Sequence, residues 1–180
     1  MTRRWALGAG LWALLAVAMS GCGYSLAGRG AFLPEYIKII GVPTFANRTT
    51  VFNLETLMTD KVRAEFIGRG HYRIVPDTAG VDALLTGEVS GVSIVPTGVG
   101  VNGLATSYAI LMTARVELKD LHEDKVLWEN PGLVFRQEYD AQGRSQSVDA
   151  ASFFTQDLNA VDRMTTEFAR TIVSAILEAF

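Results

Sequence analysis

The sequence predicts an α+β fold: a mixed sheet of about four strands with two helices packed on one face, in the order β-α-β-β-β-α. Two stretches carry apolar residues every three or four positions, the period of an amphipathic helix, and others alternate or are continuously apolar, as strands do. The chain has 180 residues, of which 49% are hydrophobic and 19% charged, which suits one compact core. A strand–helix–strand start implies a parallel crossover, and hairpins suffice to connect the later strands.

The first half of the domain is expected to contain a strand, a helix and a second strand. Residues 36–42 are β-branched or apolar almost throughout, the pattern of a strand buried on both faces. Residues 47–50 offer N-cap side chains to a helix that ends at Gly68 or Gly70. Residues 72–75 form a short strand. The apolar face of the helix comprises Leu54, Leu57, Met58, Val62 and Phe66.

A long hairpin is expected to begin with residues 83–95. In this strand Gly87 and Gly91 mark bends or bulges, and residues 96–103 form a loop. The segment at 98–103 matches the dinucleotide fingerprint GxGxxG, but a strand follows it, whereas the pyrophosphate of a dinucleotide needs a helix N-terminus. The motif therefore indicates a hairpin tip.

The rest of the chain indicates an antiparallel meander followed by a helix. Residues 107–119 alternate regularly between apolar and polar side chains, and residues 126–139 return after a turn at 122–125. The segment Asn130-Pro131-Gly132 interrupts the returning strand and indicates a break or an edge position. After a polar loop, the last helix has an apolar face of Phe154, Leu158, Val161, Phe168, Ile172 and Ile176.

The first 21 residues have the pattern of a secretory signal peptide. A short positive segment at residues 1–4 precedes an uncharged run at residues 5–19. This run falls short of the about 20 apolar residues that a spanning helix needs, and no positive cluster follows it. We therefore expect three parts: a signal peptide at 1–21, a lipidated N-terminus with a short tether at 22–35, and a single α/β domain at 36–180.

Cys22 is the expected lipidation site. The segment Met19-Ser20-Gly21-Cys22 resembles the bacterial lipobox, in which a hydrophobic residue and two small ones precede a cysteine that becomes acylated. Each buried methylene of an acyl chain contributes about 0.8 kcal/mol, so several chains anchor a protein stably. Gly23 stands where an Asp favours inner-membrane retention in the lipoproteins that this segment resembles. We expect a lipid anchor in the outer membrane, on its periplasmic side.

Charge and residue types exclude several classes of function. The 16 Lys and Arg residues against 19 Asp and Glu give a net charge of −3, so nucleic acid is not an expected partner. One cysteine and two histidines, His71 and His122, are too few for a disulfide framework or a zinc site. Neither histidine lies near a nucleophile motif, and Glu123-Asp124 indicates a solvated turn. We expect no enzyme activity, no metal and no cofactor.

The stretches from Cys22 to Gly28 (C-G-Y-S-L-A-G) and from Asp82 to Gly87 (D-A-L-L-T-G) carry a family resemblance. Together with the first strand and the first helix, they resemble the lipopolysaccharide-assembly lipoproteins of the LptE family, over nearly the whole chain after the signal peptide. The resemblance implies a small sheet covered by two helices. It also implies a non-enzymatic role: to plug the outer-membrane barrel LptD, to assist its assembly, and to contact lipopolysaccharide on its way to the cell surface.

The resemblance further implies basic residues for lipopolysaccharide at the loop end of the sheet. The loop from Pro96 to Ser107 carries no charge, so this chain departs from the family there. The nearest candidates for contact with lipopolysaccharide are Arg136 and Arg144, which flank the other loop. A solvated surface charge is the alternative for both.

The same uncharged loop is the expected contact with the barrel. Val99, Val101 and Leu104 are apolar residues in a Gly-rich stretch, whereas a free periplasmic loop more often carries charge. Burial of their apolar area would contribute about 25 cal/mol per Å². We expect this loop to be inserted in the barrel lumen; the alternative is a loop folded back on its own sheet.

A second functional reading stays open. Residues 39–47 and 82–87 also resemble lipoproteins that activate penicillin-binding proteins, and curli-secretion-type lipoproteins. An activator of a peptidoglycan synthase needs a long tether to reach far from the membrane. Only 13 residues separate Cys22 from Tyr36, which span at most about 45 Å at roughly 3.5 Å per residue. The short tether favours the LptE-like role.

Overall fold

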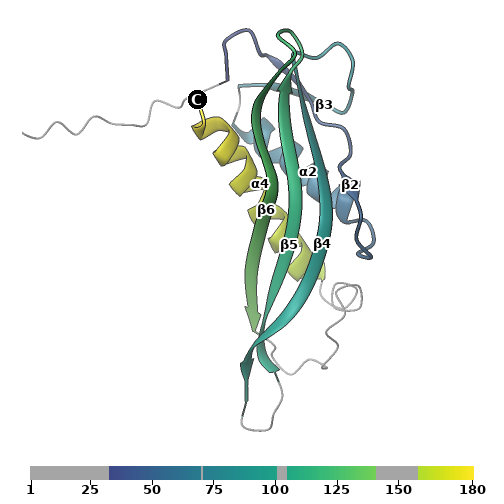
Figure 1. Ribbon diagram of the computed structural model, residues 1–180, viewed down its shortest axis with the longest axis vertical. Coiled ribbons are helices and arrows are strands. Elements are labelled where there is room, and N and C mark those ends of the chain that lie inside the picture. The colour runs from purple at the N-terminus through teal and green to yellow at the C-terminus, as the bar shows by residue number, and fades with distance from the viewer. Residues whose placement is uncertain (1–32, 70, 101–104, 141–157) are drawn as a thin grey trace, which may run out of the picture. The chain divides into compact units, whose positions relative to one another are not determined.

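The computed structural model describes residues 33–69, 71–100, 105–140 and 158–180. The chain divides into two units, residues 1–30 and 31–180, and every described residue belongs to the second unit. Its elements, in chain order, are β1 (Ile39–Gly41), β2 (Ala46–Asn47), α2 (Leu54–Gly68), β3 (Arg73–Val75), β4 (Ala83–Val99), β5 (Ala105–Asp120), β6 (Lys125–Asp140) and α4 (Leu158–Glu178) (Figure 1).

The strands form one mixed sheet of six, with the order β3-β1-β4-β5-β6 and with β2 paired to β4. β1 is parallel to both β3 and β4, which confirms the parallel crossover, and β4, β5 and β6 form an antiparallel meander. The α+β class and the element order are confirmed, but the expectation of about four strands was too low. The strand predicted at residues 72–75 is β3, so β2 is the strand that the sequence pattern missed; with two residues it is too short to show a period.

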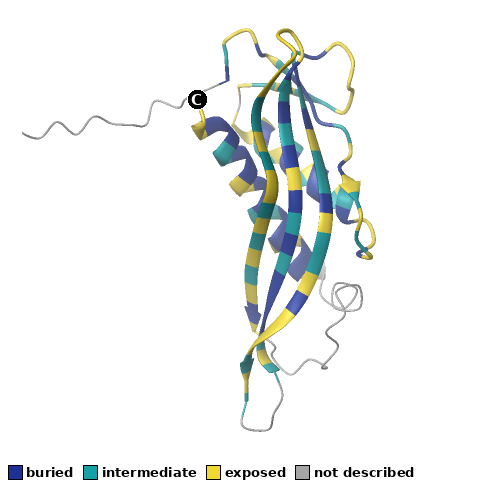
Figure 2. Ribbon diagram, viewed as in Figure 1, coloured by how far each residue is buried: buried dark blue, intermediate teal, exposed yellow. Residues whose placement is uncertain are grey.

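Both helices pack on one face of the sheet, as expected (Figure 1). The predicted apolar face of α2 is buried, apart from Leu57, which is half-buried. On α4, Val161, Phe168, Ile172 and Ile176 are buried, while Phe154 and the side chain of Leu158 lie outside the described part. The even-numbered residues of β5 from Tyr108 to Leu118 face the helices and are all buried (Figure 2). The core therefore lies between the helices and one face of the sheet, while the opposite face carries no helix among the described residues.

β4 is longer than expected, because it continues through Pro96 to Val99. The prediction of a loop at residues 96–103 is wrong for the first four of them, because they belong to β4. Pro96 is paired with Tyr108 of β5, and in the described part of the chain no strand pairs with the other edge of β4 at this point. Proline is tolerated on such a free edge, since its missing N–H is not needed there.

Gly87 and Gly91 differ in role, although the sequence pattern treats them alike. Gly91 adjoins a register shift between β4 and β5, so the predicted bulge is confirmed. Gly87 is in regular register with Val116, so β4 has no bulge at this position and the prediction of one there is wrong. A Cβ at Gly87 would lie 2.7 Å from the ring of Phe45, and this close packing explains the glycine.

The start of α2 also departs from expectation. The residue before the helix is Asn53, which has φ 61° and makes no side-chain cap hydrogen bond. The amide of Asn47, one of the predicted cap residues, instead donates to the Val51 carbonyl at 2.8 Å and to the Glu55 carboxylate at 2.8 Å. Its carbonyl oxygen accepts the backbone N–H of Thr49 at 2.9 Å. Asn47 therefore holds the loop between β2 and α2 and is not an N-cap.

β6 lies at the edge of the described sheet, as Asn130-Pro131-Gly132 predicted. The register with β5 shifts opposite Ala114 and Val116, where this segment sits. Pro131 is thus accommodated at an irregular point of an edge strand.

Candidate functional site

The end of the β4–β5 hairpin is the first candidate surface. The hairpin extends past the helices in Figure 1. Val99 is 68% exposed at the last position of β4 and is paired with Ala105. Val101 and Leu104 lie outside the described residues. Of the three predicted barrel-contact residues, the structure therefore describes one, and its side chain is open to a partner.

The predicted lipopolysaccharide contacts form no basic cluster in the described part of the chain. Arg136 lies on β6 with its side chain 53% exposed, and its guanidinium donates to the Glu138 carboxylate at 2.9 Å. Arg144 is outside the described residues, as is the predicted lipidation site Cys22. The charge of Arg136 is offset locally by Glu138.

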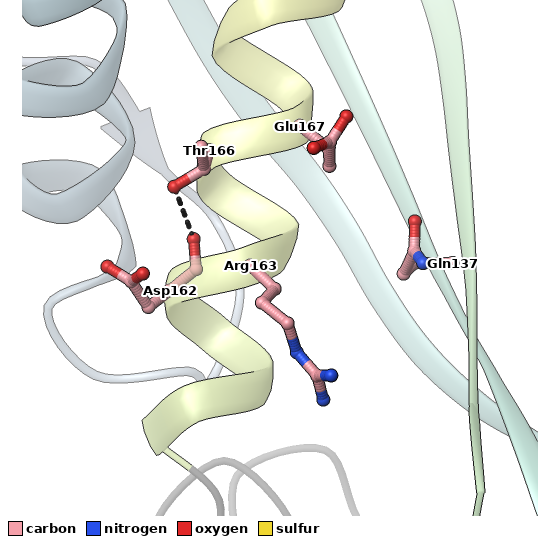
Figure 3. Close-up of a pocket in the computed structure, with 5 residues that line it drawn as sticks. All are labelled: Gln137, Asp162, Arg163, Thr166 and Glu167. Carbon is pink, nitrogen blue, oxygen red and sulfur yellow. Dashed lines mark hydrogen bonds between the residues drawn. The ribbon is translucent and has the colours of Figure 1, made fainter.

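A cavity of about 400 Å³ lies between α4 and β6, lined by Gln137, Asp162, Arg163, Thr166 and Glu167 (Figure 3). The Asp162 carboxylate is 2.6 Å from the Lys61 ammonium, and that of Glu167 is 3.2 Å from the Arg170 guanidinium. The Arg163 guanidinium lies 4.9 Å from the centroid of the Tyr139 ring. The charged side chains that line this cavity thus have partners within the protein.

A polar network joins the start of the domain to the β5–β6 turn. The Tyr36 hydroxyl donates to the fully buried carboxylate of Asp120, which also accepts the backbone N–H groups of His122 at 2.7 Å and Glu123 at 3.2 Å. Nε2 of His122 lies 2.8 Å from the Asp82 carboxylate, and its ring meets the Tyr36 ring edge-on at 5.7 Å. Asp82 lies at the start of β4, so the network links three parts of the fold.

Hydrogen bonding sets the ionisation of these groups. The bond to His122, followed by the backbone N–H groups of Lys38 and Ile39 at 2.8 Å each, lowers the pKa of Asp82 to about 2. Burial opposes ionisation of Asp120, but the hydrogen bonds from Tyr36 and from the turn outweigh it and lower its pKa. The bond to Asp120 raises the pKa of Tyr36 to about 12. Both carboxylates are thus stabilised as anions by donors.

Sequence reasoning missed this network. It placed His122 in a surface turn, which is correct, since the side chain is 57% exposed, but it assigned no partner. His122 and Asp82 are 40 positions apart and Tyr36 and Asp120 are 84 apart, so no local spacing signals either contact. The network has a structural character, because each carboxylate accepts hydrogen bonds from groups of the protein itself.

Two features are absent from the described residues. No three His, Cys, Asp or Glu side chains among them lie close enough to hold a metal ion together. None of the described helices has both the length and the hydropathy needed to cross a membrane.

Comparison with known proteins identifies the family. The sequence model of the family LptE, described as lipopolysaccharide-assembly, matches residues 37–176. The chain belongs to the LptE family. The match covers the sheet and both helices, and it confirms the family resemblance; it includes Asp82–Gly87, whereas Cys22–Gly28 lies outside it. No curated protein sequence matches the chain significantly.

The chain is similar to several solved structures. The hypothetical protein CT253 from Chlamydia trachomatis superposes with a TM-score of 0.52 at 9% identity, over 80% of this chain and 99% of that one. The rare lipoprotein B from Shewanella oneidensis gives 0.48 at 13% identity, over 77% and 93%. The PelC dodecamer from Paraburkholderia phytofirmans gives 0.49 at 16% identity, over 82% and 92%. At these identities the likeness to CT253 concerns the fold alone.

Membership of the LptE family indicates the general function of the chain. The chain is a lipoprotein of the cell envelope with a role in lipopolysaccharide assembly, in a family whose members are not enzymes.

Proposed function

We propose that this protein is anchored by acyl chains on Cys22 at the periplasmic side of the outer membrane. There it plugs and helps to assemble the LptD-type β-barrel, and so aids the insertion of lipopolysaccharide at the cell surface. The observation that carries the proposal is the LptE family match over residues 37–176. The short tether also supports it, since 13 residues between Cys22 and Tyr36 keep the domain close to the membrane.

The β4–β5 tip is the proposed contact with the barrel lumen, through Val99, Val101 and Leu104. Val99 supports this role, because an apolar side chain that is 68% exposed gains free energy when a partner covers it. The segment from Pro96 to Ser107 carries no ionisable side chain, which lowers the cost of removing it from water.

Lipopolysaccharide is the proposed second ligand, with Arg136 and Arg144 as its contacts. A guanidinium suits the phosphate groups of such a ligand, because it donates two parallel hydrogen bonds. Arg136 would have to exchange its bond to Glu138 for a phosphate, so Glu138→Gln should strengthen binding through this residue.

Co-purification from detergent-solubilised outer membranes tests the function. The wild-type lipoprotein should recover the lipopolysaccharide-transport barrel at equal stoichiometry. Val99→Asp should reduce that recovery at least about tenfold, because a carboxylate at an interface loses its hydration. Ile67→Asp is the matched control, since Ile67 is 60% exposed on α2, away from the tip.

Other outcomes would reject the proposal. Recovery of a penicillin-binding protein instead of the barrel would establish the alternative role, and recovery of neither would contradict both. Full barrel recovery by Val99→Asp would leave the plug role standing and reject the tip as its contact.

A further inference from the structure

One polar side chain interrupts the apolar row that the second half of β6 turns toward the helices. This row consists of Leu133, Phe135, Gln137 and Tyr139, which alternate with exposed residues of the outward face. Gln137 is half-buried and paired with the fully buried Ile110 of β5. Its amide makes no hydrogen bond to any described residue and opens into the cavity between α4 and β6. A leucine at this position would gain more from burial, so packing does not explain Gln137.

Arg163 reaches the same cavity from α4, opposite Gln137 (Figure 3). Its guanidinium lies over the Tyr139 ring, 4.9 Å from the centroid, and the Tyr139 hydroxyl in turn donates to the Ala160 carbonyl at 3.0 Å. A ring positions a guanidinium in this way without consuming its N–H groups. None of these N–H groups has an acceptor among the described residues. Arg163 is therefore held in place with its hydrogen-bond donors unused.

The lining residues and their ion-pair partners leave one positive charge in excess. The Asp162 carboxylate lies 2.6 Å from the Lys61 ammonium, and the Glu167 carboxylate lies 3.2 Å from the Arg170 guanidinium. Within the described part of the chain, Arg163 has no such acidic partner. An anion is therefore the kind of group that this cavity favours.

We propose that the cavity between α4 and β6 binds a singly charged carboxylate through the Arg163 guanidinium and the Gln137 amide. The guanidinium can donate two parallel hydrogen bonds to a carboxylate, and the amide NH2 group can add another. The site is separate from the β4–β5 tip and from Arg136, which belongs to the outward face of β6. It goes beyond the proposed function and does not depend on it.

The neighbouring acceptors narrow the class of ligand. Glu167 lies on the same wall as Arg163 and disfavours a doubly charged phosphate, because like charges repel. The Glu167 carboxylate and the Thr166 hydroxyl oxygen can instead accept from an N–H group beside the bound carboxylate. A free amino acid carries this combination, and so does the C-terminal residue of a peptide. The cavity, at about 400 Å³, has the volume of a small-ligand site.

Saturation-transfer NMR titrations of the full-length lipoprotein in detergent test the site with small probes. N-acetylalanine carries the carboxylate and the amide N–H of a peptide C-terminus, and it should bind. N-acetylalaninamide lacks the charge and should bind at least about tenfold more weakly, as should inorganic phosphate. Tighter binding of free alanine than of N-acetylalanine would identify an amino acid as the ligand, and the reverse order would identify a peptide C-terminus.

Three variants relate the binding to the two side chains. Arg163→Gln should weaken the binding of N-acetylalanine at least about tenfold, because it removes the charge. Arg73→Gln is the matched control and should stay within about twofold of wild type, since Arg73 is an exposed cation on β3, at the other edge of the sheet. Gln137→Leu should weaken binding and yet keep or raise the melting temperature, because it completes the apolar row.

Several results would overturn the inference. They are equal binding of N-acetylalanine and its amide, equal binding by wild type and Arg163→Gln, tighter binding of phosphate, or no binding of any probe. A lower melting temperature of Gln137→Leu together with unchanged binding would show that Gln137 serves the fold. Gln137→Leu and the comparison of the probes keep the test decisive if Arg163→Gln unfolds. Recovery of the barrel by the wild-type protein is measured separately, so failure here leaves the proposed function intact.

Discussion

Asp82 shows how one carboxylate connects distant parts of this chain. One of its oxygens accepts the backbone N–H groups of Lys38 and Ile39, and the other lies 2.8 Å from the His122 ring. The start of β1, the start of β4 and the β5–β6 turn are thereby joined through a single side chain. Because its folded-state pKa is about 2, against 3.8 for an ordinary Asp, ionised Asp82 stabilises the fold.

The pH dependence of stability tests this role. A depressed carboxylate pKa contributes stability that is complete above the unfolded pKa and is lost as the pH falls through the folded one. For Asp82 the window runs from about pH 4 down to about pH 2. Asp82→Asn should therefore be clearly less stable than wild type at pH 6, and the difference should shrink through this window, measured by urea unfolding at each pH.

The exposed Asp77 provides the control for that series. Asp77→Asn should follow the wild-type curve from pH 6 to pH 2. A constant difference between Asp82→Asn and wild type over the same range would show that the charge of Asp82 does not contribute, leaving only its hydrogen-bonding geometry.

At the scale of elements, α4 contributes the most regular part of the core. Met164, Phe168, Ile172 and Ile176 are fully buried, at 0 to 1% exposure. The Phe168 ring meets the Phe135 ring of β6 edge-on, with the centroids 6.4 Å apart. This helix therefore anchors the edge strand of the sheet, in addition to its contact with α2.

Truncation of Phe168 measures that anchoring. Phe168→Ala should lower the free energy of unfolding by about 3–5 kcal/mol, because it removes a fully buried ring and leaves a cavity. Arg170→Ala should change it by less than about 0.5 kcal/mol, since Arg170 is exposed and its pair with Glu167 is at the surface. Chemical denaturation of the two variants gives the comparison, and equal losses would mean that the buried face of α4 is misassigned.

At the scale of the whole molecule, the anchor and the domain have separate tasks. Residues 1–21 and Cys22 are expected to determine where the protein resides, and the domain within residues 37–176 carries the family match. If Cys22 is acylated as proposed, the short tether would couple the two, because it would confine the domain to the neighbourhood of the membrane.

The substitution Cys22→Ser tests whether the lipid anchor can be removed without a change in the fold of the domain. The variant should yield an unprocessed or soluble product, since no acyl chain can be attached, while its domain keeps the wild-type circular dichroism spectrum. Cell fractionation and the mass of the N-terminal peptide provide the measurements. Ser25→Ala, three residues later, should leave processing unchanged. A mature N-terminus at another residue, or wild-type protein free in the periplasm, would contradict the assignment of Cys22.

The sequence alone determined the class of fold, the order of its main elements and the family. These features depend on short-range patterns: the alternation along β5, the apolar period of α2 and α4, and the motifs around Cys22 and Asp82. Such patterns persist because each element must bury one face whatever its partners are. They also indicated the edge position of β6, because Pro131 cannot donate to a neighbouring strand.

Only the tertiary structure decided which residues meet across the chain. It brought Tyr36 to Asp120 and His122 to Asp82, placed the Phe45 ring over Gly87, and extended β4 through Pro96 on a free edge. Each of these depends on strand order and register, which are set by long-range packing and leave no periodic trace in the local sequence.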